Sequence, residues 1–205
     1  MDVPALGKDD DEAGLLARAR GGDRVAFEGL VERHLSQVWG VVWRIVRHTQ
    51  DAEDVVQDTF LTAWRSLGDF REEAALSTWL HRIAVTRALH HVERASERMR
   101  RASRSIDDEE SGPAALIALQ GGRSRAAAES PLRQLESKEL LARLQQCLDK
   151  LPPAWRAVLA LRDVDALAYD EIARVLEVAL GTVRSRLARA RMALKECLQT
   201  NWFRK

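Results

Sequence analysis

The sequence predicts an all-α protein of two small helical domains joined by a flexible linker, and three observations support this. The 205 residues are rich in the helix formers Ala, Leu, Arg and Glu, and only 5% are aromatic. Apolar residues recur at helical steps of three and four, without a clear alternating strand pattern. A polar stretch of some 30 residues loses this periodicity and is too long for an ordinary connection inside a compact domain. The predicted division is a disordered acidic leader (1–11), an N-terminal domain (12–101), the linker (102–134) and a C-terminal domain (135–205).

The composition also limits the class of protein. With 46% apolar residues the chain has enough material for one or two hydrophobic cores. Its formal net charge of only +1 argues mildly against a protein that simply coats nucleic acid. No signal peptide and no apolar run of about 20 residues is found, so we expect a cytoplasmic location without membrane insertion. Cys147 and Cys197 form no CxxC pair, and they are predicted to be free thiols in a reducing cytoplasm.

Two helices are predicted at the start of the N-terminal domain. The first covers 12–20, and the second is capped by Asp23 and continues to about His48. Trp39 and Trp43 lie four residues apart and widen the apolar face of this second helix. We interpret both tryptophans as core residues, because most such pairs are buried.

The next helix, from Asp51 to Leu67, has an unusually acidic start. Asp51, Glu53, Asp54 and Asp58 place four carboxylates within eight residues. Carboxylates in a first turn are stabilised by the helix dipole, which accounts for the first three. It accounts less well for Gln57 and Asp58, which lie further along the helix. The polar face of this helix is therefore suited to a basic partner.

A break at 68–75 precedes a helix that begins at Leu76 and becomes basic. His90-His91 in this helix suggests a metal site, but adjacent histidines point to different sides of a helix and no second cluster supports them. We therefore expect no metal or other cofactor, and prefer solvent or DNA contact for these histidines. The positive charge comes from Arg87, Arg94, Arg98, Arg100, Arg101 and Arg104.

Four helices are predicted in the C-terminal domain, at 135–148, 154–162, 165–176 and 180–195. The last two are joined by a short turn and the final one is basic, which is the helix-turn-helix pattern. Taken alone, the basic face could equally be a solvated surface; the preceding helix strengthens the interpretation as DNA recognition. Arginine forks bind phosphates and the O6 and N7 atoms of guanine. The apolar stripe consists of Val183, Leu187, Ala190 and Leu194, and the charges are Arg184, Arg186, Arg189, Arg191 and Lys195.

Several of these motifs together resemble a bacterial RNA polymerase sigma factor of the extracytoplasmic-function (ECF) group of the sigma-70 family. The resemblance covers both domains in the expected order and with the expected gap. It implies a factor that brings core polymerase to promoters, recognises their −10 and −35 elements and promotes strand opening. The motifs are DAEDVVQDTF (51–60), FR (70–71), TWLHRIA (78–84), LP (151–152), VLALR (158–162), YDEIA (169–173) and GTVRSRLARAR (181–191).

The resemblance implies three sets of site residues and three partners. The partners are core polymerase (its β′ clamp and β subunits), promoter DNA and an anti-sigma factor, and the acidic part of the linker would thread through the polymerase cleft. Polymerase binding is implied for Asp54, Val55, Gln57, Asp58, Phe60, Leu61 and Trp64. Contact with the −10 element is implied for Phe70, Arg71, Ser77, Trp79, Arg82, Thr86, Arg87, His90 and Arg94. Contact with the −35 element is implied for Thr182, Arg184, Ser185, Arg186, Arg189 and Arg191.

The chain departs from the family pattern at five places. Ala168 replaces the usual Ser or Thr cap, which costs about 1 kcal/mol, and Glu177 replaces a Gly in the turn, which costs about 1–2 kcal/mol if φ is positive. We therefore expect the apolar core rather than the caps to hold the motif together. Ala179 stands where Pro or a small polar residue is frequent, Thr86 stands where Asn is frequent, and the loop 72–76 is more acidic than expected beside DNA.

Three other classes of protein fit the sequence less well. A stand-alone helix-turn-helix regulator would carry a sensory or dimerisation domain, which the acidic helix and the basic helix before the linker do not resemble. An enzyme is not expected, because no Gly-rich phosphate loop, metal-ligand spacing or nucleophile motif occurs. An adaptor that binds only polymerase would not need the basic C-terminal helix.

Overall fold

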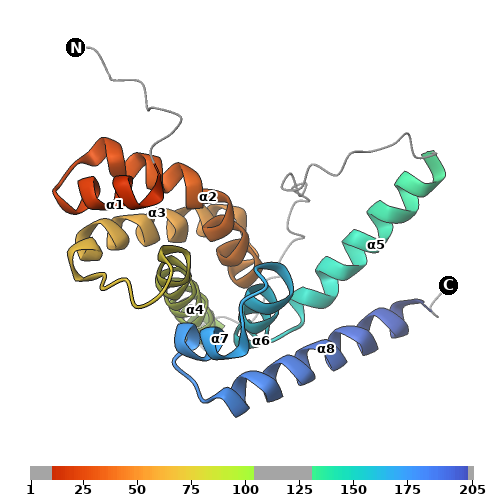
Figure 1. Ribbon diagram of the computed structural model, residues 1–205. Coiled ribbons are helices and arrows are strands. Elements are labelled where there is room, and N and C mark those ends of the chain that lie inside the picture. Colours follow the sequence, from red (N-terminus) through yellow and green to blue (C-terminus); the bar gives the residue numbers. More distant parts are fainter. Residues whose placement is uncertain (1–10, 104–130, 203–205) are drawn as a thin grey trace.

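The computed structural model describes residues 11–103 and 131–202, and side chains within 11–101 and 139–200. Within these ranges every regular element is a helix, so the predicted all-α class is confirmed (Figure 1). The N-terminal domain contains α1 (Glu12–Arg20), α2 (Arg24–Val46), α3 (Thr49–Ser66), the short η1 (Leu67–Asp69) and α4 (Leu76–Ser103). The C-terminal domain contains α5 (Pro131–Asp149), α6 (Pro153–Leu159), η2 (Ala160–Val164), α7 (Tyr169–Leu176) and α8 (Leu180–Trp202).

Side-chain caps determine where the first two helices begin. The carboxylate of Asp11 accepts a hydrogen bond from the Gly14 amide at 2.7 Å, so this residue caps α1 and is not part of the leader. Asp23 accepts from the amides of Val25 and Ala26 at 2.9 and 3.1 Å, as its predicted role requires. The rest of the predicted leader lies outside the described residues.

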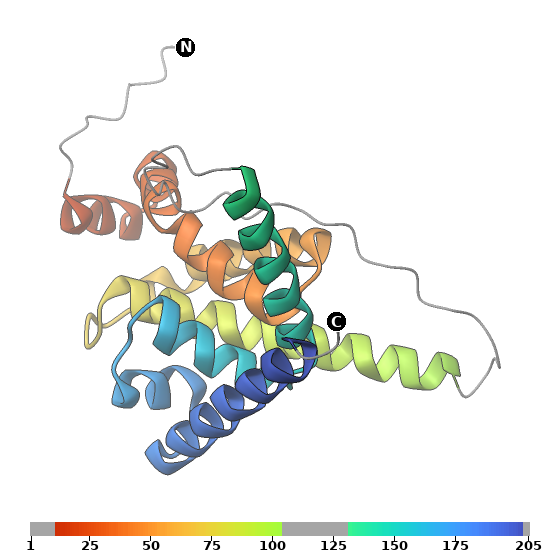
Figure 2. The same ribbon diagram turned by 90° about the vertical axis from the view of Figure 1, so that its right-hand side faces the viewer.

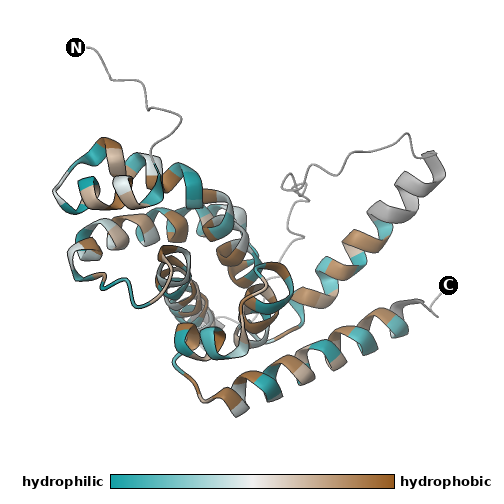
Figure 3. Cartoon of the chain, in the orientation of Figure 1, coloured by the Kyte–Doolittle hydropathy of each residue, from teal (hydrophilic) through white to brown (hydrophobic). Residues whose placement is uncertain are grey.

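The N-terminal domain is built around α2, which packs against α1, α3 and α4. Apolar side chains line the inner side of each helix, and Figure 3 shows the alternation of hydrophobic and hydrophilic residues around the helices. Trp39 and Trp43 are half-buried and pack against the core, so their interpretation as core residues is confirmed only in part. Trp39 lines a surface groove, and Trp43 lies beneath the guanidinium of Arg47. The core itself contains Leu30, Val38, Val41, Val42, Ile45, Val56, Leu80, Ala84 and Val85.

The structure of the C-terminal domain confirms the predicted helix-turn-helix. It also shows the conformations of Glu177 and Ala168, two residues that depart from the family pattern. Glu177 ends α7 at φ 51° and ψ 42°, the left-handed conformation that usually favours glycine. Ala168 has no side-chain oxygen to cap α7, and only its amide is satisfied, by the Glu171 carboxylate at 2.8 Å. The motif is therefore held by its buried residues, Ile172, Val175, Val183, Leu187 and Ala190.

Several helix boundaries differ from the prediction. α6 ends at Leu159, and a wider turn follows in which the Asp165 amide donates to the Ala160 carbonyl at 3.1 Å. α4 continues to Ser103 and α5 begins at Pro131, so both ends of the predicted linker are helical. Proline at the first helical position loses no internal hydrogen bond, which explains why α5 can begin there. The helical turn predicted at 114–120 lies outside the described residues.

The two domains pack directly against each other. Helices α2 and α4 contact α6, η2 and α7, and the two views in Figures 1 and 2 agree on this arrangement. α5 and α8 lie on the far side of the C-terminal domain, where they contact each other. α8 contacts α6 and α7, so these two helices connect it to the N-terminal domain.

The prediction of free cysteines is wrong. Cys147 of α5 and Cys197 of α8 form a disulfide, with their Cα atoms 5.8 Å apart. Fifty residues separate them in sequence, so no local spacing motif could indicate the pairing. The tertiary packing of α5 on α8 brings the two thiols together. This bond links the C-terminal part of α5 covalently to the C-terminal part of α8.

Reduction of this disulfide should destabilise the C-terminal domain by about 2–4 kcal/mol, because an open 50-residue loop gains conformational entropy on unfolding. Urea unfolding with and without dithiothreitol measures the difference. The double variant Cys147→Ser/Cys197→Ser serves as the control and should not respond to the reductant. Identical unfolding curves for the wild-type protein in both conditions would show that the bond carries no stability.

Candidate functional site

An apolar groove of about 700 Å³ runs along the surface between α2 and α3. We call it the α2–α3 groove. Leu35 and Leu61 lie in it with 44% and 46% of their surfaces exposed, which is unusual for large apolar residues. The rings of Phe27 and Trp64 pack at 4.9 Å and close one part of it. Its walls are Arg24, Phe27, Glu28, Val31, Leu35 and Trp39 from α2, and Glu53, Val56, Gln57, Phe60, Leu61 and Trp64 from α3.

The groove includes only part of the predicted polymerase-binding set. Gln57, Phe60, Leu61 and Trp64 line it. Asp54 is exposed on α3 but does not line the groove, and Asp58, one turn later on the same side of the helix, lines a different hollow between α3 and α4. Val55 is 4% exposed and packs inward, so its side chain is not available to a partner.

The wall that α2 contributes contains none of the predicted site residues. Phe27, Val31, Leu35 and Trp39 follow one another at four-residue steps, and this spacing was visible in the sequence. A helical pattern alone does not tell which apolar face of a helix has no neighbouring element, so the spacing could not distinguish an open groove from a buried stripe.

A second hollow, of about 800 Å³, lies between α3 and α4, and we call it the α3–α4 hollow. It contains four of the predicted −10 residues and additional cations from the last turns of α4. The guanidinium of Arg87 donates to the hydroxyl of Thr62 at 2.7 Å and so links the two helices. Cations outnumber acids here, which suits contact with a phosphate backbone. Its residues are Val55, Asp58, Thr86, Arg87, His90, His91, Arg94, Glu97, Arg98 and Arg101.

A third hollow, of about 360 Å³, surrounds the loop before α4, and we call it the loop hollow. The rings of Phe70 and Trp79 pack at 5.1 Å in its wall. Ser77 is half-buried and lines neither hollow, and the other eight predicted −10 residues divide equally over the two hollows. Two residues of α7 complete the loop hollow from the other domain. Its residues are Asp69, Phe70, Arg71, Glu73, Ala74, Thr78, Trp79, Arg82, Arg174 and Val175.

Arg20, at the end of α1, holds this loop in place and was not identified from the sequence. Its Nη1 lies 2.5 Å from the carboxylate of Glu72, and its Nη2 donates to the carbonyl of Phe70. Its guanidinium also stacks 5.5 Å from the centre of the Phe70 ring. Glu72 has φ 58°, so the loop adopts a strained conformation that these contacts stabilise. The unexpected acidity of the loop is thus partly explained, because one carboxylate neutralises Arg20.

The basic helix α8 presents its predicted −35 residues in different ways. Arg184, Ser185 and Arg189 are exposed, and Thr182 and Arg186 are half-exposed. The Ser185 hydroxyl donates to the Thr182 carbonyl at 3.0 Å. Arg191 forms an ion pair with Asp163 of η2, and this hydrogen bond raises the pKa of Arg191. Arg191 is therefore engaged in an ion pair within the chain. The exposed residues of the predicted −35 set lie in the first half of α8.

Two further findings concern the described residues. No group of three His, Cys, Asp or Glu side chains within them is placed to hold a metal ion. None of the described helices combines the length and the apolar character that crossing a membrane requires.

The fold and these surfaces define a two-domain helical protein of the sigma class. Residues 30–98 match the family model described as Sigma-70 region 2, and residues 141–194 match that of Sigma-70, region 4. The RNA polymerase sigma-H factor of Pseudomonas aeruginosa is 36% identical over 90% of this chain and 92% of its own length. The ECF RNA polymerase sigma-E factor of Escherichia coli K12 is 35% identical over 90% of this chain and 93% of its own length.

The chain belongs to the sigma-70 family, in its ECF group. It is therefore a sigma factor, which directs RNA polymerase to promoters in transcription initiation, and the alternative of a stand-alone regulator is not favoured.

Two solved structures share the fold. One is CnrH in complex with the cytosolic domain of CnrY, with a TM-score of 0.60, 27% identity and coverage of 93% of this chain and 99% of CnrH. The other is the sigma factor RpoE in complex with the anti-sigma factor NepR from Bartonella quintana, with a TM-score of 0.63, 24% identity and coverage of 84% and 96%.

Substitution of Arg20 by Ala should loosen the loop at 70–75, because the loop loses an ion pair, a carbonyl hydrogen bond and a ring contact. Amide hydrogen exchange in this loop should become faster, and the free energy of unfolding should fall by about 1–2 kcal/mol. Arg18→Ala is a matched control, because Arg18 of α1 pairs with Asp23, the residue that caps α2, and that pair does not involve the loop. Unchanged loop exchange in Arg20→Ala would contradict the anchoring role.

Proposed function

We propose that this sigma factor binds core RNA polymerase through the α2–α3 groove and recognises promoters with two separate surfaces. The loop hollow and the α3–α4 hollow contact the −10 element, and the first half of α8 contacts the −35 element. The observation that carries the proposal is the arrangement of one open apolar groove and two basic surfaces on a chain whose net charge is only +1. Such segregated surfaces suit one protein partner and two nucleic-acid contacts.

The α2–α3 groove suits a helical partner with both apolar and basic side chains. Leu35 and Leu61 offer exposed apolar surface, and burial of that surface stabilises a complex by about 25 cal/mol per Å². Glu53 and Gln57 in the wall, with Asp54 beside it, add acidic and amide groups. We assign this groove to the β′ clamp of the polymerase, and the β subunit to a contact elsewhere on the chain.

The loop hollow suits capture of an unpaired base from the melted strand. Phe70 and Trp79 provide aromatic surface for stacking, and Arg71 and Arg82 provide cations for the backbone. The cations of the α3–α4 hollow, including Arg87 and Arg94, continue this positive surface along α4. The two hollows together supply both requirements of strand capture, a site for a base and charge for phosphates.

The exposed half of α8 suits the major groove of the −35 element. Arg184 and Arg189 are exposed and carry planar forks that bind phosphates or guanine edges. Arg191 has a structural role instead, because its ion pair with Asp163 positions α8 against η2. Recognition therefore depends on residues near the amino end of the helix.

We further propose control by an anti-sigma factor, activity in the cytoplasm and no enzymatic step. CnrH and RpoE were solved with the cytosolic domain of CnrY and with the anti-sigma factor NepR, respectively, and they share this fold. Binding and recognition account for the role without covalent chemistry. The cytoplasm is the compartment where polymerase and promoter DNA are present together.

In vitro transcription with core RNA polymerase on a promoter library tests the central proposal. Addition of the purified protein should produce initiation at specific sites that core polymerase alone does not use. Absence of specific initiation would refute the proposal. Tight binding to promoter duplex without polymerase would instead support a stand-alone regulator.

Leu61→Asp should weaken the affinity for core polymerase by at least about tenfold, because binding would bury an unpaired charge in an apolar groove. Leu61 is 46% exposed, so the substitution should leave the fold intact. Fluorescence anisotropy with labelled core polymerase gives the dissociation constant. Met99→Asp is a matched control, because Met99 is 69% exposed on α4 and lies outside the groove. Equal affinities for both variants would exclude the groove as the docking site.

Arg184→Ala should lower initiation at promoters that need the −35 element by about five- to a hundredfold, and leave core binding unchanged, because a bidentate base contact is worth about 1–3 kcal/mol. Comparison of promoters with and without a −35 element separates this effect from a general loss of activity. Lys195→Ala, at an exposed position about three turns later on α8, should have a much smaller effect. Parallel losses of core binding and initiation in Arg184→Ala would assign this arginine to the fold.

A further inference from the structure

The disulfide between Cys147 and Cys197 joins two helical segments that have little core of their own. Among the described side chains of α5, at 139–149, Cys147 is the one that is buried. Among those of α8, the buried side chains all lie in the first half of the helix, and none follows between 191 and 200. The contact between α5 and the end of α8 is therefore centred on a covalent bond rather than on a packed apolar layer.

Apolar surface on both sides of this bond is open to solvent. Leu140 and Leu141 of α5 are 52% and 44% exposed, and Met192 of α8 is 58% exposed. Ala193 is half-buried and packs against the core, and Cys197 lies one turn beyond it. A helical segment that buries little apolar surface gains little stability from tertiary packing. The end of α8 is therefore held weakly apart from the disulfide.

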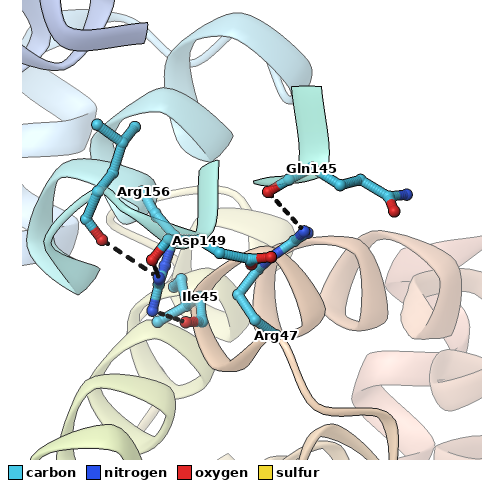
Figure 4. Close-up of polar contacts among 6 residues, drawn as sticks. Ile45, Arg47, Gln145, Asp149 and Arg156 are labelled. Atoms are coloured by element: carbon cyan, nitrogen blue, oxygen red, sulfur yellow. Dashed lines mark hydrogen bonds and ion pairs between the residues drawn. The ribbon is translucent and has the colours of Figure 1, made fainter. Parts of the chain in front are cut away.

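The end of α5 has a second support, which comes from the N-terminal domain (Figure 4). The Nε atom of Arg47 lies 2.5 Å from the Asp149 carboxylate, and Nη2 of the same arginine donates to the Gln145 carbonyl at 3.3 Å. These two partners stand two residues before and two residues after Cys147 in the sequence. The position of Cys147 is thus supported independently of the disulfide, and the end of α8 depends on the bond more than α5 does.

The two cysteines differ in their access to solvent. Cys147 is fully buried, whereas Cys197 is half-exposed. The rate of thiol–disulfide exchange depends on whether an attacking thiolate can reach one of the two sulfur atoms. Cys197 is therefore the side from which a thiolate in solution reaches the bond without unfolding of the domain.

We propose that Cys147 and Cys197 form a reversible redox site, which a dithiol reductant opens and a disulfide oxidant closes, and which controls the attachment of the end of α8 to α5. The inference rests on the cytoplasmic location in the proposed function, because disulfides of cytosolic proteins are usually transient and catalytic or redox-sensing. In the reduced form α8 frays beyond Ala193. Its first half keeps its buried residues and its ion pair between Arg191 and Asp163.

Reduction of the site transfers two electrons and two protons from the dithiol to the chain. One thiolate of the reductant attacks Sγ of Cys197, a mixed disulfide forms, and Cys147 leaves as a thiolate that takes up a proton. The second thiol of the reductant then attacks the reductant's own sulfur in the mixed disulfide, and Cys197 leaves and is protonated in turn. The reductant ends as a disulfide. Oxidised glutathione reverses these steps and is itself reduced to two thiols.

Thiol trapping on the full chain tests whether the site exchanges in the folded protein. Native protein is treated with dithiothreitol and then with oxidised glutathione, and samples are quenched with acid, alkylated and analysed by mass spectrometry. Both thiols should become reactive in the first step and be lost in the second. Urea below the unfolding transition should change the reduction rate by less than about twofold. Reduction that occurs only after unfolding would make the bond purely structural and overturn the proposal.

Trapping in living cells tests whether the redox state of a bacterial cytoplasm controls the site. Cells that express the full chain are quenched with acid before and after treatment with diamide, an oxidant of thiols. The two cysteines should be mainly reduced before the treatment and mainly joined after it. A chain that stays in one state, whether reduced or oxidised, would overturn the proposal.

Amide hydrogen exchange tests what the bond controls. In the reduced chain, exchange at 194–200 should be at least about tenfold faster than in the oxidised chain, whereas exchange at 180–190 should not change. The variant Cys147→Ser/Cys197→Ser should match the reduced chain under both conditions. Equal exchange at 194–200 in both states, or equal acceleration along the whole of α8, would contradict a local release.

Transcription with core polymerase adds a measurement that depends on the proposed function. Oxidised and reduced chains should support equal initiation at promoters with a −35 element, because Arg184 and Arg189 lie in the half of α8 that keeps its core. A loss of this initiation in the reduced chain would contradict a release confined to the end of α8. If neither form initiates, the proposed function fails, whereas trapping and hydrogen exchange still decide whether the redox site exists.

Discussion

The buried guanidinium of Arg156 determines how the two domains meet. A cation removed from water needs hydrogen-bond acceptors close by, and burial lowers the pKa of this arginine. Its own domain supplies the carbonyls of Asp149 and Leu151, at 3.3 and 3.2 Å, and α2 supplies the carbonyl of Ile45. Because one of the three acceptors belongs to the other domain, the end of α2 must lie against the start of α6. The position of α7 over the loop before α4 follows from that contact.

The near-zero net charge results from surfaces of different character. The α2–α3 groove is apolar with acidic and amide residues at its wall, while the α3–α4 hollow and the first half of α8 are cationic. Within the chain some charges of the two domains neutralise one another, as in the pair Arg82–Glu177. Arg82 therefore stabilises the contact between the two domains, and in the proposed function the same arginine contacts a nucleic acid.

Much of the fold could be predicted from local patterns. The helical spacing of apolar residues located the helices to within a few residues, and Asp23 was recognised as a cap because its side chain bonds to amides nearby in sequence. The left-handed conformation of Glu177 agrees with the resemblance to the family, whose pattern has Gly at this position in the turn. Long-range contacts could not be predicted from the sequence. Arg20 forms an ion pair with Glu72, 52 residues later, and Arg191 forms one with Asp163 of η2. The local sequence around a charged residue does not indicate which distant residue it will pair with.

The sequence by itself determined the helices, the helix-turn-helix, the family and the types of residue on each candidate surface. These depend on periodicity and capping, which act over a few residues along the chain. Only the tertiary structure decided which apolar stripe stays open, as on α2, and that Cys147 joins Cys197. It also decided that the helix-turn-helix covers the −10 loop. The physical reason is that burial, disulfide pairing and domain contact depend on distances between residues far apart in sequence, which packing alone fixes.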